Sequence, residues 1–195
     1  TRLAPLYGIL REALRSGHQG PITLLHGAQN PSGLYLVSEL AALAQQLPLP
    51  VVLLGSSKES GLCREIATAA NATRPGQCLD FSGKTSLDQA LAVIAAARAM
   101  VSNDSGLMHV AAAFGVPQVA LFGSSSPLHT PPLSDRAHVI WLKNDASYQP
   151  ALDCAPCFAR TCPLGHTRCL VDITPEQVLR YLRSRVSAPG AGWLQ

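Results

Sequence analysis

Short apolar runs alternate along the chain with longer stretches in which apolar residues recur at helical spacing. The runs are three to five residues long, which is the length of buried strands. The predicted strands are residues 22–25, 51–54, 78–80, 99–102, 118–122 and 139–142. Continuous apolar strands that alternate with helices are typical of a parallel sheet covered on both faces. The pattern therefore predicts an α/β fold with a doubly wound, Rossmann-like parallel sheet.

The helices between these strands are predicted from apolar spacing and from residues that start or stop a helix. One helix covers residues 36–47, because four leucines lie on one face and Pro48 stops it, and another covers 58–70. Two capping boxes open helices at Ser86 and at Thr174, since each hydroxyl is followed three residues later by a glutamine. The expected inner faces are Leu87, Leu91 and Ile94 after Ser86, and Val178, Leu182 and Val186 after Thr174.

The loops that follow the strands are the candidate binding region, because ligands of parallel sheets lie beyond the carboxyl ends of the strands. The loop with the most specific sequence signal joins strand 99–102 to a helix expected to run from Asp104 to Phe114. The inner face of that helix is expected to carry Leu107, Val110 and Phe114. Residues 1–187 are predicted to form one domain with a cysteine-rich segment at 150–170, followed by a flexible tail at 188–195.

The residues at the start of this helix are of the types that bind anions at helix N-termini. Asp104 is suited to cap the helix, and Ser105 and Gly106 then supply backbone N–H groups that have no partner inside it. Free amides and the helix dipole together suit a diphosphate, and His109 lies one turn further on. The alternative is plain helix capping by Asp104 with a solvated His109.

The loop after strand 118–122 is the second candidate. Gly123, Ser124 and Ser125 combine short hydroxyl donors with backbone amides. Such a loop could hold a phosphate beside the first site if the two strands are neighbours. A serine-rich turn without a ligand is the alternative.

Four segments together resemble the ADP-heptose:lipopolysaccharide heptosyltransferases, of the type that adds the second heptose. They are residues 102–113, 122–127, 130–134 and 154–170, and the similarity extends over roughly 50–186. The resemblance implies the carboxy-terminal, donor-binding half of a GT-B glycosyltransferase, working in the cytoplasm on the lipopolysaccharide inner core. It also implies an inverting displacement at the anomeric carbon of the sugar, with ADP as leaving group and no cofactor needed for the chemistry.

The resemblance assigns donor-binding roles by position. Asp104 would hold sugar hydroxyls, and the nearby amides would hold the diphosphate. Glu59 lies where the family has a ribose-binding carboxylate, although an exposed acid near a helix start is also favoured by the dipole. Thr85 lies where the family contacts adenine. The predicted donor-binding set is Asp104, Ser105, Gly106, His109, Gly123, Ser124, Ser125, Glu59, Thr85 and Lys84.

Two departures from the family pattern concern charge and catalysis. The family places a lysine shortly after Pro-Gly-Ala, whereas residues 26–37 contain His26-Gly27-Ala28 and no Lys or Arg. Loss of that cation removes charge-assisted bonding worth a few kcal/mol, and Lys84 is the candidate substitute. The general base of the family is a carboxylate in the amino-terminal acceptor domain, which we expect to be absent from these 195 residues. We therefore expect no catalytic residue here and no turnover by the chain alone.

Four cysteines follow the spacing C-x2-C-x4-C-x6-C. A CxxC pair with two further cysteines nearby is a candidate four-thiolate site for structural zinc or iron, with His166 able to replace one thiolate. Free cysteines or disulfides are the alternatives. Cys63 and Cys78 are isolated and are expected to be small buried side chains. The candidate metal ligands are Cys154, Cys157, Cys162 and Cys169.

Composition limits the possible partners. Charged residues make up 14% of the chain against about 25% on average, which suggests that part of its surface meets another domain. The net charge of +3 suits an anionic ligand, but no Lys/Arg run indicates nucleic-acid binding. No apolar run reaches the ~18 residues of a membrane span, and the first residues do not resemble a signal peptide. We expect a cytoplasmic protein, at most peripheral at the inner membrane, with reduced cysteines.

Two other functions remain as alternatives. The chain could be a non-catalytic nucleotide-sugar-binding module that has lost its phosphate lysine and acts in an assembly. A Rossmann oxidoreductase would need G-x-G-x-x-G after the first strand, and residues 26–33 do not contain it.

Overall fold

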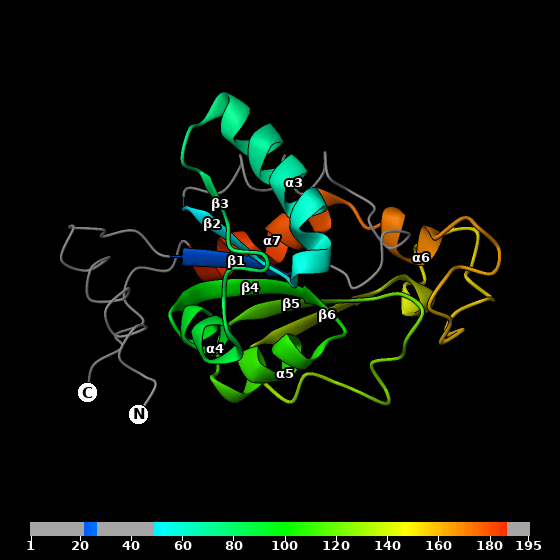
Figure 1. Ribbon diagram of the computed structural model, residues 1–195. Coiled ribbons are helices and arrows are strands. Elements are labelled where there is room, and N and C mark those ends of the chain that lie inside the picture. Colours follow the sequence, from blue (N-terminus) through cyan, green and yellow to red (C-terminus); the bar gives the residue numbers. More distant parts are fainter. Residues whose placement is uncertain (1–21, 27–48, 187–195) are drawn as a thin grey trace.

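The computed structural model describes residues 22–26 and 49–186, which build one sheet with parallel neighbours throughout (Figure 1). The strand order β3-β2-β1-β4-β5-β6 is that of a doubly wound Rossmann-type sheet, as the sequence predicts. The strands are β1 (Ile22–His26), β2 (Val51–Leu54), β3 (Cys78–Asp80), β4 (Ala97–Asn103), β5 (Gln118–Phe122) and β6 (Ala137–Trp141).

Helices cover both faces of the sheet. Figure 1 shows α3 and α7 on one side of it and α4 and α5 on the other. The predicted helix 36–47 and the tail 188–195 lie outside the described residues. The described helices are η2 (Ser57–Glu59), α3 (Ser60–Thr73), α4 (Leu87–Ala95), α5 (Gly106–Ala113), η3 (Leu142–Asn144), α6 (Arg168–Val171) and α7 (Pro175–Val186).

The core is divided by the sheet into two layers, because successive strand residues point to opposite faces. Val51 and Leu53 of β2 belong to the layer that includes α3 and α7, whereas Val52 and Leu54 belong to the layer under α4. All four residues are at most 3% exposed. Complete burial of each such side chain stabilises the fold by about 1.5–3 kcal/mol. The continuous apolar strands of the sequence are thus explained by burial on both faces.

Both predicted capping boxes are present. The Ser86 amide donates to Oε1 of Gln89 at 2.8 Å, and the Gln89 amide donates to Oγ of Ser86 at 3.3 Å. The same reciprocal pair joins Thr174 to Gln177, at 2.7 and 3.3 Å. These local signals fix the starts of α4 and α7 correctly.

The expected inner faces of α4 and α5 are partly wrong. Leu87 is 67% exposed and Phe114 is 44% exposed. Both lie at helix ends, since Leu87 is the first residue of α4 and Phe114 is the C-cap of α5. At the ends of a helix, the helical repeat does not predict which side chains face the sheet. The buried residues are Ala90 and Ile94 of α4, and Met108, Ala111 and Ala112 of α5.

Candidate functional site

The strand order places the turn after β4 at the point where a doubly wound sheet opens a crevice. The chain leaves β1 toward β2 on one side, whereas β4 pairs with β1 on the other side. The loops that follow β1 and β4 therefore diverge, and ligands bind between them at the carboxyl edge. Asp104 and Ser105 follow β4 directly and lie at this switch point. The loop after β1 lies outside the described residues.

The sequence predicts Asp104 as the N-cap of α5, but the N-cap in the structure is Ser105. The Ser105 hydroxyl makes no capping bond and lies 3.1 Å from Oγ of Ser102. The Met108 amide donates to the Ser105 carbonyl at 3.1 Å, whereas no described carbonyl accepts from the Gly106 amide. Gly106 is exposed, and a Cβ added to it would meet nothing within 4 Å. With respect to the described residues, the helix therefore begins in open space with an unpaired donor, as an anion site requires.

Asp104 is held by a residue of another loop. Thr130 Oγ1 lies 3.1 Å from each carboxylate oxygen of Asp104, so its single hydroxyl hydrogen is shared between them. This bond explains why Asp104 does not cap α5, because its carboxylate turns toward the loop after β5. His109 is exposed one turn further along α5. The structure thus brings Thr130, in the loop after β5, against Asp104 beside the start of α5.

The loop after β5 packs against the cysteine-rich segment. A Cβ on Gly123 would lie 2.4 Å from Cγ of Leu170, so only glycine fits beneath that side chain. The Ser124 carbonyl accepts a hydrogen bond from the Phe158 amide at 2.7 Å. Ser124 and Ser125 are half-buried. Gly123 therefore has a packing role that no local sequence pattern predicts, and its phosphate role stays a prediction.

Glu59 has a structural role at the end of β2. Its side chain is buried, with the residue 6% exposed, and Oε2 accepts a hydrogen bond from the Ser56 amide in a capping box. The expectation of an exposed acid near a helix start is therefore wrong, because the carboxylate folds back onto the backbone. Its ribose-binding role stays a prediction.

Lys84 is engaged by Asp80 at the end of β3. Its ammonium donates to the Asp80 carbonyl at 2.7 Å and lies 3.4 Å from Oδ2 of the same residue. Burial raises the pKa of Asp80, but hydrogen bonds from Ser82 and the charge of Lys84 outweigh it and hold the pKa below its usual range. Because β3 lies three strand spacings of about 4.8 Å from β4, this placement argues against Lys84 as a phosphate cation at Gly106. The adenine-binding role of Thr85 stays a prediction.

The four cysteines of the 154–169 segment are free and line one cavity of about 70 Å³. Burial, and then the neighbouring thiols of Cys154, Cys157 and Cys162, raise the pKa of Cys169 to about 11. Backbone amides, first that of Thr167, lower the pKa of Cys162. Across residues 22–26 and 49–186, no three His, Cys, Asp or Glu side chains already have metal-coordinating positions. The two isolated cysteines, Cys63 and Cys78, are buried as predicted.

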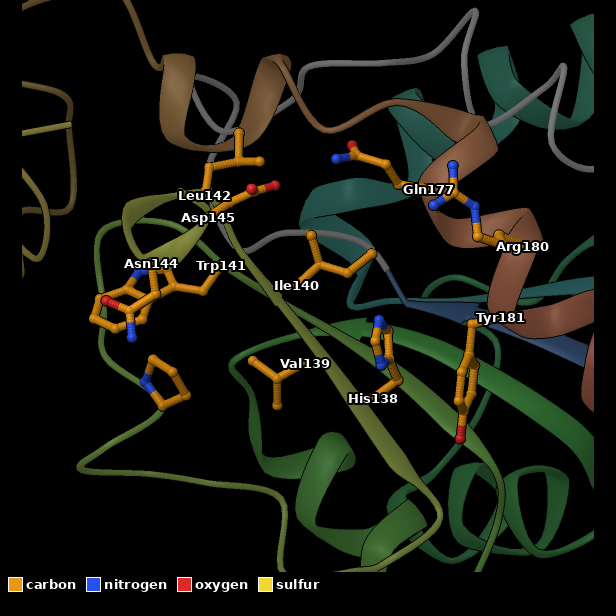
Figure 2. Close-up of a pocket in the computed structure, with 11 residues that line it drawn as sticks. His138, Val139, Ile140, Trp141, Leu142, Asn144, Asp145, Gln177, Arg180 and Tyr181 are labelled. Carbon is orange, nitrogen blue, oxygen red and sulfur yellow. The ribbon is translucent and has the colours of Figure 1, made fainter. Parts of the chain in front are cut away.

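A larger cavity of about 660 Å³ lies along β6 and α7. Figure 2 shows side chains from both elements around it, including His138 and Tyr181, whose rings stack with centroids 4.8 Å apart. None of the predicted donor-binding residues lines this cavity. It is therefore separate from the switch-point site.

The strand order defines a Rossmann-like α/β domain, with the start of α5 at its switch point. Residues 11–167 match the family described as glycosyltransferase family 9 (heptosyltransferase). The chain belongs to this family. Lipopolysaccharide heptosyltransferase 2 of Salmonella typhimurium is 44% identical over 153 residues, which cover 77% of this chain and 42% of that relative. The chain thus spans about two fifths of the length of the curated relative.

Two solved structures share the fold. The structure of E. coli ADP-heptose lps heptosyltransferase II has a TM-score of 0.71 and 36% identity, and the match covers 91% of this chain and 50% of the other. A family 9 glycosyltransferase from Veillonella parvula has a TM-score of 0.70 at 20% identity, covering 92% and 51%, which shows likeness of fold alone. No described helix is long and apolar enough to cross a membrane.

Proposed function

We propose that this chain is the donor-binding part of a heptosyltransferase and holds the diphosphate of ADP-heptose at the start of α5. The carrying observation is the open helix end at the switch point, where the Gly106 amide is unpaired among the described residues. An anionic diphosphate gains both hydrogen bonds and the favourable end of the helix dipole there. The mild positive charge of the chain suits the same ligand.

Asp104 is the proposed contact for sugar hydroxyls. Its carboxylate is fixed by Thr130 and lies beside the helix start, so it can accept bonds from a sugar attached to the diphosphate. A carboxylate this close to a bound diphosphate would repel it unless sugar hydroxyls lay between them. This arrangement favours a nucleotide sugar over a free nucleotide.

The reaction proposed for the whole protein is inverting transfer of heptose to the lipopolysaccharide inner core at the cytoplasmic face of the inner membrane. An acceptor hydroxyl attacks the anomeric carbon, the bond to ADP breaks, and the α5 site stabilises the charge that develops on the leaving diphosphate. The general base is proposed to come from an amino-terminal acceptor domain. The present residues therefore bind, orient and stabilise, and do not take the proton.

Gly106→Pro tests the site directly. Proline is tolerated at the first position of a helix, and Ser105 already has the extended conformation that precedes proline, with φ −154° and ψ 164°. The substitution removes the amide donor while the helix persists. We expect calorimetric titration to show ADP binding in the micromolar range for the wild-type chain and at least a tenfold loss in the variant, since a bond to a charged group is worth about 1.5–3 kcal/mol.

Gly106→Ala is the matched control, because it keeps the amide and its Cβ meets nothing within 4 Å. It should bind ADP like the wild type, and circular dichroism should show that both variants fold. Equal ADP affinity of Gly106→Pro and Gly106→Ala would contradict the site. Absence of binding by the wild type at millimolar ADP would favour the non-catalytic module instead.

A further inference from the structure

The cysteine-rich segment forms a small chamber that the proposed donor site does not use. All four cysteines of the segment line a single cavity of about 70 Å³, although they are spread over sixteen residues from Cys154 to Cys169. The cavity has room for an ion but not for a nucleotide. The chain from Asp145 to Thr167 contains no helix or strand, and Leu152 and Ala155 attach it to the core.

We propose that Cys154, Cys157, Cys162 and Cys169 bind one thiophilic metal ion, zinc or ferrous iron, as a structural four-thiolate site. Thiolates select these metals, and four protein ligands leave no open position for chemistry. This proposal does not depend on the donor-binding function.

The backbone already favours a charged sulfur at one corner of the chamber. The Thr167 amide lies 3.5 Å from Sγ of Cys162 and donates to it. Amide donors aimed at a sulfur stabilise its thiolate form, which is the form that binds a metal. The loop from Cys162 to Thr167 therefore directs a backbone donor at a sulfur that lines the chamber.

His166 lies at the chamber but is not one of the proposed metal ligands. Its Nδ1 accepts a hydrogen bond from the Arg168 amide at 3.1 Å, which places the ring proton on Nε2. Nε2 lies 3.9 Å from Sγ of Cys154, where it donates to the sulfur. A metal-bound histidine has the opposite arrangement, with its second nitrogen donating to a carbonyl or carboxylate. The ring therefore supports the Cys154 thiolate, and the sequence-based option of His166 as a ligand is not retained.

Binding requires the four sulfurs to close on the ion. As described, no three potential ligands have coordinating positions. Tetrahedral zinc thiolates have Zn–S distances of about 2.3 Å, so neighbouring sulfurs must come within about 3.8 Å of one another. Rotation of cysteine side chains around a cavity that they already line supplies this movement. We expect the ion to stabilise the conformation that the segment already has.

The chamber is attached to the loop after β5. Leu170, next to Cys169, packs on Gly123, and the Phe158 amide, next to Cys157, donates to the Ser124 carbonyl. The Phe158 ring also stacks on His129 with centroids 5.5 Å apart. A metal that orders the chamber therefore also holds this loop, which is the structural role we assign to it.

The test begins with elemental analysis of the 195-residue chain purified without chelators. We expect about one zinc or iron per chain, and zinc or iron content tells the two metals apart. Cys154→Ser and Cys162→Ser should each lose the metal. Cys63→Ala is the matched control, because Cys63 is a buried residue of α3 that does not line the chamber, and it should keep the metal. His166→Asn should also keep it, since the ring is not a ligand.

Cobalt substitution gives a readout that does not depend on whether the variants fold. The wild-type chain, freed of metal and loaded with Co²⁺, should show intense thiolate-to-cobalt charge-transfer absorption, and the loaded chain should melt at a higher temperature than the metal-free chain. Bound cobalt should also protect four cysteines from alkylation. Near-zero zinc and iron together with no charge-transfer band would overturn the site. Disulfides among these cysteines in the freshly purified chain, or loss of metal in His166→Asn with retention in a cysteine variant, would overturn the four-thiolate assignment.

Discussion

Gly123→Ala tests whether the loop after β5 is shaped by packing or by a phosphate. The added Cβ would lie 2.4 Å from Cγ of Leu170 and 2.8 Å from each of its Cδ atoms. Contacts this short cannot persist, so Leu170 or the loop must move. Overpacking of this kind costs typically about 1–3 kcal/mol. At about 2–4 °C per kcal/mol for a chain of this size, the melting temperature should fall measurably.

A double-mutant cycle assigns that cost to one contact. In a Leu170→Ala background the clashing atoms are absent, so Gly123→Ala should be nearly neutral there. The coupling free energy from urea unfolding should then equal most of the cost of the single variant, about 1–3 kcal/mol. Gly61→Ala in α3 is the matched control, because its Cβ meets nothing within 4 Å and alanine is favoured over glycine in a helix by about 0.5–1 kcal/mol.

The packing explanation and the phosphate explanation predict opposite patterns. If Gly123 serves close approach of a diphosphate, Gly123→Ala should lower ADP affinity and leave the unfolding free energy unchanged. If it serves Leu170, stability falls and Leu170→Ala restores it. An unchanged melting temperature for Gly123→Ala, or an equal loss in both backgrounds, would refute the packing argument.

Two further predictions concern the loops around the site. Thr130→Val removes the donor that fixes Asp104. ADP-heptose should then bind roughly two- to tenfold more weakly, the equivalent of about 0.5–1.5 kcal/mol, while ADP binds as before. Equal losses for both ligands in calorimetric titration would contradict a sugar-binding Asp104. Asp80→Asn should flatten the acid limb of the stability curve. Because the pKa of Asp80 is lowered in the folded state, its carboxylate adds to the free energy of unfolding above the unfolded-state pKa. This stabilisation is lost as the pH falls through the lower folded-state pKa. An Asp80→Asn variant whose stability in urea unfolding depends on acid pH as the wild type does would count against this account.

Features fixed by neighbouring residues could be predicted from the sequence. The capping boxes at Ser86 and Thr174 depend on a glutamine three residues later, and both form as predicted. The strands follow from apolar runs that are buried on both faces, and 118–122 matches β5 at both ends. The four segments 102–113, 122–127, 130–134 and 154–170 likewise predict the family that the comparisons show.

Features fixed by distant residues could not be predicted. The segment Asp104-Ser105-Gly106 offers two possible N-caps, and the choice depends on Thr130, which lies 26 residues further along the chain. The phosphate-loop role of Gly123 stays a prediction, but its packing beneath Leu170 of α6 could not be predicted from the loop itself. In both cases the contact comes from a distant part of the chain that local sequence patterns do not reveal.

Strand order is the missing information that matters most for the donor site. The sequence predicts that loops after strands gather at one edge of the sheet, but it does not say which loops are neighbours. Because β4 pairs with β1 and β3 lies at the outer edge, Gly106 occupies the switch point while Lys84 is three strands away and bound to Asp80. Residues 26–37, which begin at the end of β1, carry no Lys or Arg. In the proposed site the helix amides and His109 would therefore bear more of the anion binding than they would beside a lysine.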